Sequence, residues 1–427
     1  MGAGTMQLEQ LFLENYRGID SALLDFQGKS TVFFGINGAG KSSFLRGINL
    51  LFAHIINRIA ANQFRQQISL TRDDVRFGSS KAKLYGQFSF ENQERLRYGF
   101  SYNKGSNILH MKKDDLQKFR ETFTNLYLTE ETETAMMPVF VFYGINRAVF
   151  DVPLRIRKTH EFGRLEAFQN AIESKTDFRT FFEWFRNQED IENEQKNALQ
   201  DFSYTDPALN AVKEAIYKML PELSDLRISR RPRLQMCANK NGQTLNIEQL
   251  SDGEKCILAM LGDLARRLAL ANPHSKEPLQ GGGIVLIDEI ELHMHPSWQR
   301  KILPLLHETF PKIQFIVTTH SPQVLGEIPA DFNLFLLTRE ESDPTKIKID
   351  PKQPGYYDSN LILEDMMDTP SVDMHVTELE GKIFAAIEEK NYDKASSLVK
   401  ELYALTNEKD PAITRAMILI RRAKAGL

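Results

Sequence analysis

The stretch GINGAGKS at residues 35–42 fits the pattern G-x-x-x-x-G-K-[ST] without a mismatch. The apolar run Thr31–Phe34 before it predicts a strand, and the pattern at Ser43–Leu51 after it predicts a helix. A strand, a glycine-rich loop and a helix in this order form a phosphate-binding loop, or P-loop, whose backbone N–H groups surround an anion. This context argues against the alternative, a chance glycine-rich turn.

The side chains of this loop are expected to bind a nucleoside triphosphate together with Mg²⁺. Lys41 is expected to reach the β- and γ-phosphates, and the hydroxyl of Ser42 to bind Mg²⁺. The residues expected to hold the nucleotide here are Gly35, Asn37, Gly38, Gly40, Lys41, Ser42 and Ser43.

A second motif places two carboxylates at the end of a strand. Gly283–Ile287 is a continuous apolar run, typical of a buried parallel strand, and it ends in Asp288 and Glu289. Asp288 is expected to hold Mg²⁺ through water, and Glu289 to orient or deprotonate the attacking water. Two solvated acids at a strand end are the alternative, but the P-loop already requires such a strand.

A third motif places a histidine at the end of another strand. The run Ile313–Thr318 predicts this strand, and His320 follows it. A lone histidine more often has an ordinary structural role. The interval from Asp288 leaves room for one helix and one strand, so we expect His320 to contact the γ-phosphate.

The sequence LSDGEK at residues 250–255 opens a helical run, Cys256–Leu270. Ser251 is expected to cap this helix in a capping box with Glu254. A helix N-terminus with Ser251 and Gly253 is also an anion site. Because the P-loop already binds one nucleotide, this second site would bind the γ-phosphate of the ATP held by a partner subunit. Ser251 can cap its own helix and contact that phosphate at the same time.

These four motifs follow one another along the chain as the P-loop, LSDGEK, the acidic pair and the histidine. In that order they resemble those of the ATP-binding-cassette ATPases, and within them the branch of SMC, RecF and OLD proteins. The resemblance to this branch lies in LSDGE at 250–254, DEIELHMHP at 288–296 and LENYRGI at 13–19. A looser likeness, to the ATPase subunit of Septu-type and retron-associated antiphage systems, lies in Asp73-Asp74, in Tyr143–Arg147 and in a short helical C-terminus.

The resemblance implies ATP and Mg²⁺ as ligands and a head-to-tail dimer, or a larger homo-oligomer, that buries two ATP molecules. Each ATP would lie between Ser251 of one chain and a set from the other chain, Lys41, Ser42, Asp288, Glu289 and His320. It also implies a partner nuclease of the HNH type, which ATP binding would regulate. The alternative is a repair ATPase of the RecF or SMC kind, whose hydrolysis DNA would stimulate.

The expected fold is an α/β ATP-binding-cassette head with a mixed sheet, an antiparallel meander, a helical insertion and a short C-terminal helical segment. The expected divisions are an N-terminal lobe at 6–159, the insertion at 160–223, a C-terminal lobe at 224–345 and the helical segment at 346–427. The meander lies between Lys81 and Lys112, and Met137–Tyr143 is expected as a central strand. The aromatic residues of the insertion are expected in its core. The C-terminal helices would pack on the head, dimerise or dock a partner.

Composition gives no signature of nucleic-acid binding, because the 53 Lys and Arg residues are balanced by 57 Asp and Glu residues, for a net charge of −4. DNA or RNA contact would need a local patch, at Arg227–Arg233 or Arg155–Lys158, although such charge runs are usually solvated. Two cysteines and the lack of an 18-residue apolar run predict a soluble, cytoplasmic protein without membrane contact. Residues 1–5 are expected to be an added leader before a natural start at Met6.

No nuclease site is expected in this chain. The residues after Ser321 lack the Glu and Asp-x-Asp pattern of a Toprim domain. His293 and His295 are expected to lie in the loop beyond the acidic pair rather than to bind a metal. The glutamine loop of transporter ATPases is not evident in the sequence, and Gln87 and Asn146 are the candidates for its Mg²⁺-sensing position. This gap, together with LSDGE and the inserted meander, makes the transporter class a poor fit.

Overall fold

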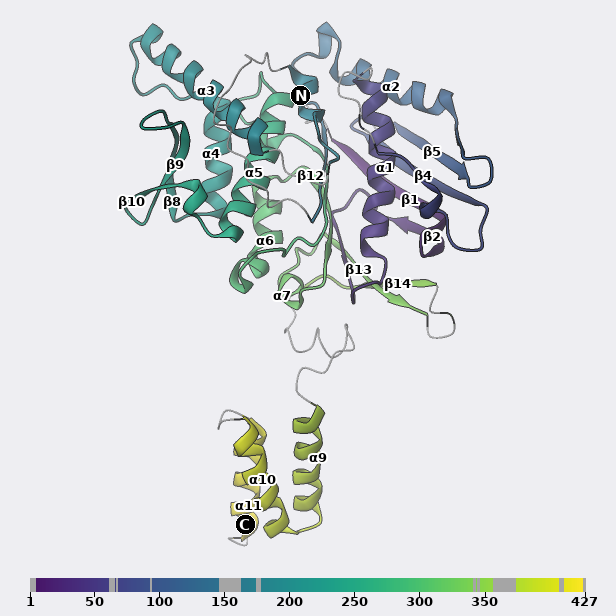
Figure 1. Ribbon diagram of the computed structural model, residues 1–427, viewed down its shortest axis with the longest axis vertical. Helices are drawn as coiled ribbons and strands as arrows, with labels where there is room; N and C mark the ends of the chain where they lie inside the picture. The colour runs from purple at the N-terminus through teal and green to yellow at the C-terminus, as the bar shows by residue number, and fades with distance from the viewer. Residues whose placement is uncertain are drawn as a thin grey trace. The chain divides into compact units, whose positions relative to one another are not determined.

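The computed structural model describes residues 5–60, 66, 68–92, 94–145, 163–173, 178–340, 343, 346–355, 374–406 and 411–424. The chain divides into two compact units, Met1–Tyr357 and Asp358–Leu427. The first contains two large sheets with helices, and the described residues of the second form the helices α9, α10 and α11 (Figure 1).

The larger unit is built on a six-stranded sheet in the order β14-β13-β3-β12-β11-β7. Its strands are β3 (Thr31–Phe34), β7 (Val139–Tyr143), β11 (Gly283–Ile287), β12 (Ile313–Thr319), β13 (Asn333–Arg339) and β14 (Ile347–Lys352). All neighbouring strands run parallel except β13 and β14, which are antiparallel. Strands β3, β11 and β12 are buried at every position, which explains their unbroken apolar sequences.

A second, antiparallel sheet has the order β2-β1-β4-β5-β6 and contains the expected meander. Its strands are β1 (Met6–Tyr16), β2 (Ile19–Asp25), β4 (Lys81–Phe90), β5 (Arg95–Asn103) and β6 (Ile108–Met111). A third sheet, β10-β9-β8, is formed by β8 (Leu223–Ser229), β9 (Gln235–Lys240) and β10 (Gln243–Asn246).

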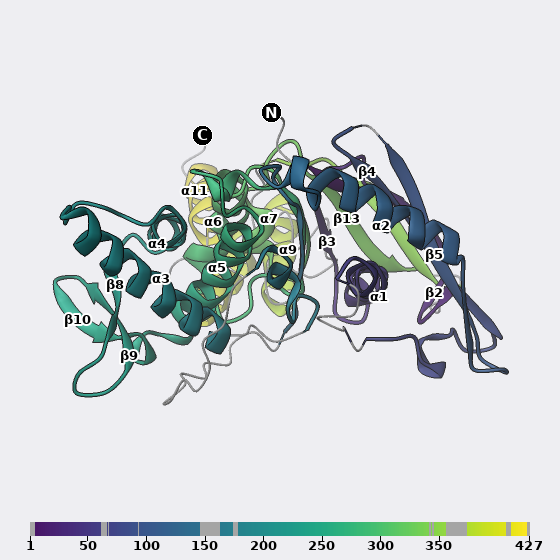
Figure 2. The same cartoon turned by 90° about the horizontal axis from the view of Figure 1, so that it is seen from above.

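Helix α1 (Lys41–Ile59) lies between the two large sheets (Figure 2). Its Phe44 stacks on Phe33 of β3, with ring centroids 5.4 Å apart. Further along, Phe52 lies 5.1 Å from Phe140 of β7 and 6.5 Å from Phe88 of β4, centroid to centroid. Both sheets therefore hold the helix that follows the P-loop, and this packing fixes where the loop lies.

Helices also cover the side of the main sheet that faces away from α1 (Figure 2). They include α3 (Phe178–Leu199), α4 (Pro207–Met219), α5 (Asp252–Ala271) and α6 (Pro296–Thr309). The aromatic residues of the insertion are buried, as expected: Phe168, Phe178, Phe181, Phe182, Trp184 and Phe185. Phe181 packs so closely on α5 that a Cβ at Gly262 would lie 2.7 Å from its ring. The described residues of this unit also form α2 (Lys113–Tyr127) and the short α7 (Pro322–Leu325).

The expectation of a central strand at Met137–Tyr143 is wrong, because β7 lies at the edge of the described sheet. Its residues are nevertheless buried, since Tyr143 bonds to α5 and Phe140 stacks on Phe168, 5.8 Å between ring centroids. The backbone N–H of Phe142 also donates to the Ala171 carbonyl at 2.7 Å. Helices and a neighbouring segment thus bury β7 on the side where the described sheet has no paired strand. An apolar sequence is expected both for a strand buried in this way and for a central strand, so the sequence could not distinguish them.

Three boundaries differ from the sequence expectation. Helix α1 begins at Lys41 rather than Ser43 and continues to Ile59. Strand β14 pairs with β13 in the main sheet, although the C-terminal helical segment was expected from residue 346. The described helices of that segment begin at Met374.

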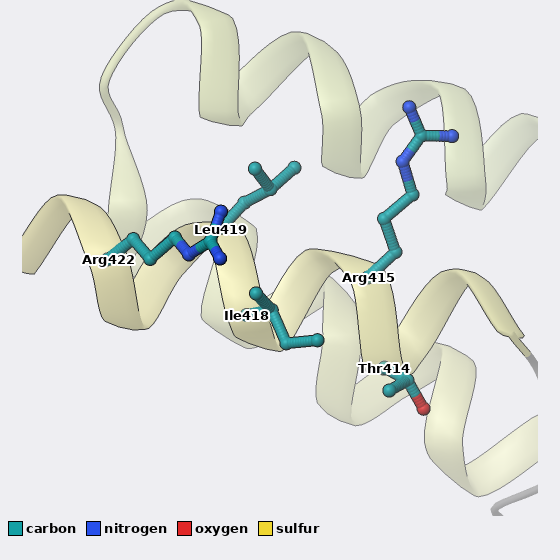
Figure 3. Close-up of a pocket in the computed structure, with 5 residues that line it drawn as sticks. All are labelled: Thr414, Arg415, Ile418, Leu419 and Arg422. Atoms are coloured by element: carbon teal, nitrogen blue, oxygen red, sulfur yellow. The ribbon is translucent and has the colours of Figure 1, made fainter. Parts of the chain in front are cut away.

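The C-terminal unit contains α9 (Met374–Glu388), α10 (Tyr392–Thr406) and α11 (Pro411–Lys424). Its buried core includes Leu379, Ile383, Val399, Leu402 and Ile413. Helix α11 also lines a surface pocket with Thr414, Arg415, Ile418, Leu419 and Arg422 (Figure 3).

None of the helices in the described parts of the chain combines the length and apolarity that crossing a lipid bilayer requires.

Asp74 joins the start of the antiparallel sheet to α1. Its carboxylate accepts hydrogen bonds from Arg17 Nε at 2.9 Å, from Arg46 Nη2 at 3.2 Å and from the Thr71 backbone at 3.1 Å. Burial alone would raise the pKa of Asp74, but the bonds from Arg46, Arg17 and Thr71 outweigh it and lower the pKa to about 2. The ionised carboxylate therefore stabilises the fold.

We expect Asp74→Asn to lower the free energy of unfolding by about 2 kcal/mol at pH 7, the equivalent of the pKa difference. The depressed pKa means that this stabilisation is complete above the ordinary pKa of an aspartate and is lost as pH falls toward 2. Denaturant unfolding at pH 7 and below pH 4 measures both effects. The control is Asp73→Asn, which changes an exposed neighbour. Equal losses for both variants would contradict the assignment.

Candidate nucleotide site

The P-loop connects β3 to α1 through glycines with left-handed backbone. Gly35, Gly38 and Gly40 have φ of 138°, 79° and 94°, a region that other residues rarely adopt. Close packing also requires Gly35, because a Cβ there would lie 2.3 Å from the Leu337 carbonyl oxygen of β13. The amino group of Lys41 donates to the carbonyls of Gly35 and Ile36, at 2.7 and 3.0 Å. The loop therefore curls around its own lysine.

A pocket of about 260 Å³ opens over this loop. Its lining residues are Gly18, Asn37, Gly38, Gly40, Lys41, Ser42, Ser43, Glu289, Arg339 and Ile347. The structure thus brings Glu289 together with most of the residues that the sequence assigned to the nucleotide. Gly18, Arg339 and Ile347 were not among the residues expected from the sequence.

Lys41 has an electrostatic environment that suits an anion. Its side chain is buried, and burial lowers the pKa of the amino group. The carboxylates of Glu291, Glu289 and Asp288 act in the opposite direction and favour the charged form. A bound phosphate would add to that stabilisation.

Asp288 accepts hydrogen bonds from both the P-loop helix α1 and strand β12. The Ser42 hydroxyl donates to Asp288 Oδ1 at 2.9 Å, and the Thr318 hydroxyl donates to the same oxygen at 2.6 Å. A hydroxyl and a carboxylate are the hard oxygen ligands that Mg²⁺ prefers, so Ser42 and Asp288 fit a magnesium site.

Glu289 has a constrained backbone beside that carboxylate. Its φ is 48°, which is unusual for a residue other than glycine. Its N–H donates to the Thr318 hydroxyl oxygen at 2.8 Å. Thr318 therefore fixes both acidic residues, with one hydrogen bond donated and one accepted.

His320 is held by a buried carboxylate. Glu291 Oε1 accepts from the His320 backbone N–H at 2.8 Å and lies 2.9 Å from His320 Nδ1. Glu291 is 5% exposed, whereas the His320 side chain is 43% exposed. A proton on Nδ1 would donate to Glu291 and leave Nε2 as the acceptor or donor for a ligand.

The LSDGEK motif forms the expected capping box at the start of α5. The Ser251 hydroxyl donates to Glu254 Oε2 at 2.7 Å, and Glu254 N–H lies 3.4 Å from that hydroxyl. Gly253 is required within this chain, because a Cβ there would lie 2.5 Å from the His293 carbonyl oxygen. Ser251 is exposed and is not among the residues that line the pocket.

Other residues singled out from the sequence lie elsewhere or outside the described chain. Gln87 is on β4 in the antiparallel sheet, and Asn146 is outside the described residues. Arg227 and Arg230 form ion pairs with Asp225 and Asp190. Of these arginines only Arg227 lies on a strand, because β8 ends at Ser229. The group Arg155–Lys158 also lies outside the described residues.

Thr318 and Glu291 were given no role from the sequence, yet each orders a candidate residue. Thr318 left only a positional signal in the sequence, since it lies near the end of the strand that precedes His320. Arg339 and Ile347 left no such signal, because strand pairing brings them to the P-loop: β13 pairs with β3, and β14 pairs with β13.

The mostly parallel sheet, the P-loop after β3 and the acidic pair after β11, with β12 between these two strands, define the head of a P-loop ATPase. The sequence family described as "AAA domain, putative AbiEii toxin, Type IV TA system" matches residues 30–326. The match spans more than half of the chain, and the chain belongs to this family.

Named relatives agree with the resemblance found in the sequence. The chain is 32% identical to the Retron Ec83 probable ATPase of Escherichia coli, over 78% of this chain and 72% of that protein. It is 23% identical to the Septu protein PtuA of Bacillus thuringiensis, over 90% and 91% of the two chains. The fold is similar to the crystal structure of the SmcHead bound to the C-winged helix domain of ScpA, with a TM-score of 0.50 and 16% identity. That likeness covers 81% of this chain and 98% of the other, and it confirms the expected fold class.

We expect Thr318→Val to lower the turnover of ATP by about ten- to hundred-fold with little change in KM, because it removes two hydrogen bonds to the acidic pair. Steady-state kinetics measure this split, and Thr318→Ser, which keeps the hydroxyl, should restore turnover. Thr309→Val is the control, since Thr309 is a buried threonine on α6 whose hydroxyl has no hydrogen-bond partner among the described residues. Equal effects of Thr318→Val and Thr309→Val would refute the positioning role.

Proposed function

We propose that the chain binds ATP and Mg²⁺ at the P-loop and hydrolyses the ATP. The observation that carries this proposal is the arrangement at Asp288, where Ser42 and Thr318 converge on one carboxylate oxygen next to Glu289. The P-loop backbone and Lys41 bind the phosphates, with Gly35, Asn37, Gly38, Gly40 and Ser43 along the loop. Ser42 and Asp288 hold Mg²⁺, which neutralises charge on the phosphates when bound.

Glu289 orients and deprotonates the attacking water, and His320 contacts the γ-phosphate. Phosphoryl transfer depends mainly on position and charge, so the constrained backbone of Glu289 is a functional feature. Glu291 supports His320 from behind and sets the orientation of its ring. The three carboxylates of the segment at residues 288–291 therefore have separate roles in this proposal. Asp288 holds Mg²⁺, Glu289 acts on the water and Glu291 orients His320.

A second copy of the chain completes each site in this proposal. Ser251 and Gly253 at the start of α5 would contact the γ-phosphate bound by the other copy. Two observations support it: Ser251 is exposed, and it does not line the P-loop pocket of its own chain. Two head-to-tail copies would bury two ATP molecules, and larger homo-oligomers would use the same contact.

We also propose a biological role in prokaryotic antiphage defence, as an oligomeric ATPase that senses infection and regulates a partner nuclease of the HNH type in the cytoplasm. The support is the similarity to proteins named for retrons and Septu. The C-terminal helices are the proposed docking element, because α11 has partly exposed Ile418 and Leu419 between Arg415 and Arg422 (Figure 3). Contact with DNA or RNA remains part of the proposal, with a DNA-stimulated repair ATPase as the alternative.

We expect Glu289→Gln to bind ATP with unchanged affinity and to hydrolyse it at least a hundred-fold more slowly, because it keeps the shape of the side chain but loses the base. Lys41→Ala should instead weaken ATP binding itself. Equilibrium binding and single-turnover hydrolysis separate the two effects. Wild-type hydrolysis by Glu289→Gln, or wild-type affinity in Lys41→Ala, would disprove the corresponding role.

We expect ATP and Mg²⁺ to raise the native mass of Glu289→Gln from monomer to dimer or larger, as measured by light scattering. Ser251→Arg, combined with Glu289→Gln, should still bind ATP but remain monomeric, because the added side chain obstructs the shared contact. Turnover of the wild type with and without DNA decides the role. Slow turnover that DNA leaves unchanged supports a regulatory ATPase, whereas strong stimulation by DNA favours the repair alternative.

A further inference from the structure

The hydroxyl of Ser251 already has an acceptor for its one proton. It donates to Glu254 Oε2 at 2.7 Å, and the same carboxylate oxygen accepts the Ser251 backbone N–H at 2.9 Å. The serine oxygen in turn accepts the Glu254 N–H, at 3.4 Å, and this bond caps α5. A phosphate oxygen only accepts hydrogen bonds, so a contact with a γ-phosphate needs the proton that Ser251 gives to Glu254.

The Glu254 carboxylate is buried and charged. Its side chain is 4% exposed, although it lies at a helix end that is proposed to contact an anion. Burial alone would raise the pKa of Glu254, but the hydrogen bonds from Lys240 and Ser251 outweigh it and lower the pKa. A negative charge in this position holds the hydroxyl proton and repels a phosphate.

Lys240 compensates this charge from the third sheet. Its Nζ donates to Glu254 Oε1, the carboxylate oxygen that Ser251 does not use. Lys240 is the last residue of β9, and the turn Asn241-Gly242 leads from it into β10. The two turn residues have φ of 51° and 81°, as the tight turn of a hairpin requires. The hairpin that precedes the LSDGEK motif therefore supplies the cation for its glutamate.

The start of α5 is also fixed by contacts that do not involve this lysine. A Cβ at Gly253 would lie 2.5 Å from the His293 carbonyl oxygen, so the backbone of the first turn is packed against that loop. The other acidic side chain of the first turn, Asp252, is exposed and lies 3.3 Å from Lys255. Rotation of the Ser251 hydroxyl is therefore the local change that a γ-phosphate needs, and Glu254 is the group that opposes it.

We propose that Lys240 is a positioning residue for the contact between Ser251 and the γ-phosphate bound by a second copy. This inference rests on the proposed function, because it takes the ATP to lie between two copies. Lys240 holds Glu254 Oε1 and cancels its charge, so the Ser251 hydroxyl turns to the phosphate while the Ser251 N–H stays on Oε2. The Glu254 N–H keeps its bond to the serine oxygen, and α5 remains capped. Assembly then exchanges a hydrogen bond within the chain for one between copies.

The test measures the ATP-dependent dimer in a Glu289→Gln background, in which hydrolysis is blocked. Sedimentation velocity at saturating Mg·ATP gives the dimer Kd of this chain and of the same chain with Lys240→Met, with Glu254→Gln and with both. We expect Lys240→Met to weaken the dimer by about ten-fold or more, because it leaves the carboxylate uncompensated. Glu254→Gln should tighten the dimer, since glutamine completes the same capping box without the charge. Once Glu254 is glutamine, Lys240→Met should change the Kd by less than about two-fold.

Lys83→Met is the matched control. Lys83 lies on β4, its side chain is 35% exposed against 28% for Lys240, and it pairs with Glu14 at 2.8 Å. This substitution should leave the dimer Kd unchanged, and Lys240→Arg, which keeps the charge, should retain most of the dimer affinity. The affinity of the monomer for ATP, measured below the dimer Kd, should be equal in all these variants, because none of the substituted lysines lines the P-loop pocket.

The outcomes separate this role from a structural one. A tighter dimer in Glu254→Gln supports the inference, and a loss of folding could not produce it. Equal weakening by Lys240→Met with and without Glu254→Gln would show that Lys240 does not act through the carboxylate, and it would overturn the inference. An unchanged Kd in Lys240→Met would do the same. If the Glu289→Gln chain binds ATP but does not dimerise, the proposed shared site is itself refuted, together with this inference.

Discussion

The hydrogen bonds that converge on Asp288 connect three segments of the chain that lie far apart in the sequence. Ser42 reaches Asp288 from the start of α1, and Thr318 reaches it from the end of β12. These bonds require β3, β12 and β11 to lie side by side in parallel, with their carboxyl ends at one edge. The buried apolar strands and α1 between the two sheets provide that arrangement, so core packing and site geometry have a common origin.

The same threonine explains how an unfavourable conformation persists at Glu289. A left-handed backbone at a residue other than glycine costs on the order of 1–3 kcal/mol and needs support from its surroundings. The Thr318 hydroxyl provides it, because it accepts the Glu289 N–H while donating to Asp288. The strain is therefore held by the strand that leads to His320. On the proposed mechanism, the base, the magnesium ligand and the γ-phosphate contact are positioned by adjacent residues of one edge.

Features set by short stretches could be predicted from the sequence. The P-loop, the strand before Asp288 and the capping box at Ser251 each depend on residues within a few positions, and the structure contains all three. Features that depend on contacts between segments far apart in the sequence could not be predicted. The apolar sequence of β7 could not show that it lies at an edge, since Phe168 and Ala171 cover it from a later segment. Arg339 reaches the P-loop because β13 pairs with β3, and Ile347 reaches it because β14 pairs with β13.

On the proposed function, the position of the capping serine couples ATP binding to assembly. Ser251 is exposed and already satisfies the end of its own helix through Glu254, so the helix does not need a ligand to be stable. Ser251 does not line the pocket of its own chain, and on the proposed function its hydroxyl contacts the γ-phosphate of an ATP bound by a second copy. An ATP held between two copies would favour the assembly by the free energy of that contact, and by reciprocity assembly would tighten ATP binding. A site divided in this way suits a protein whose nucleotide controls which complex forms.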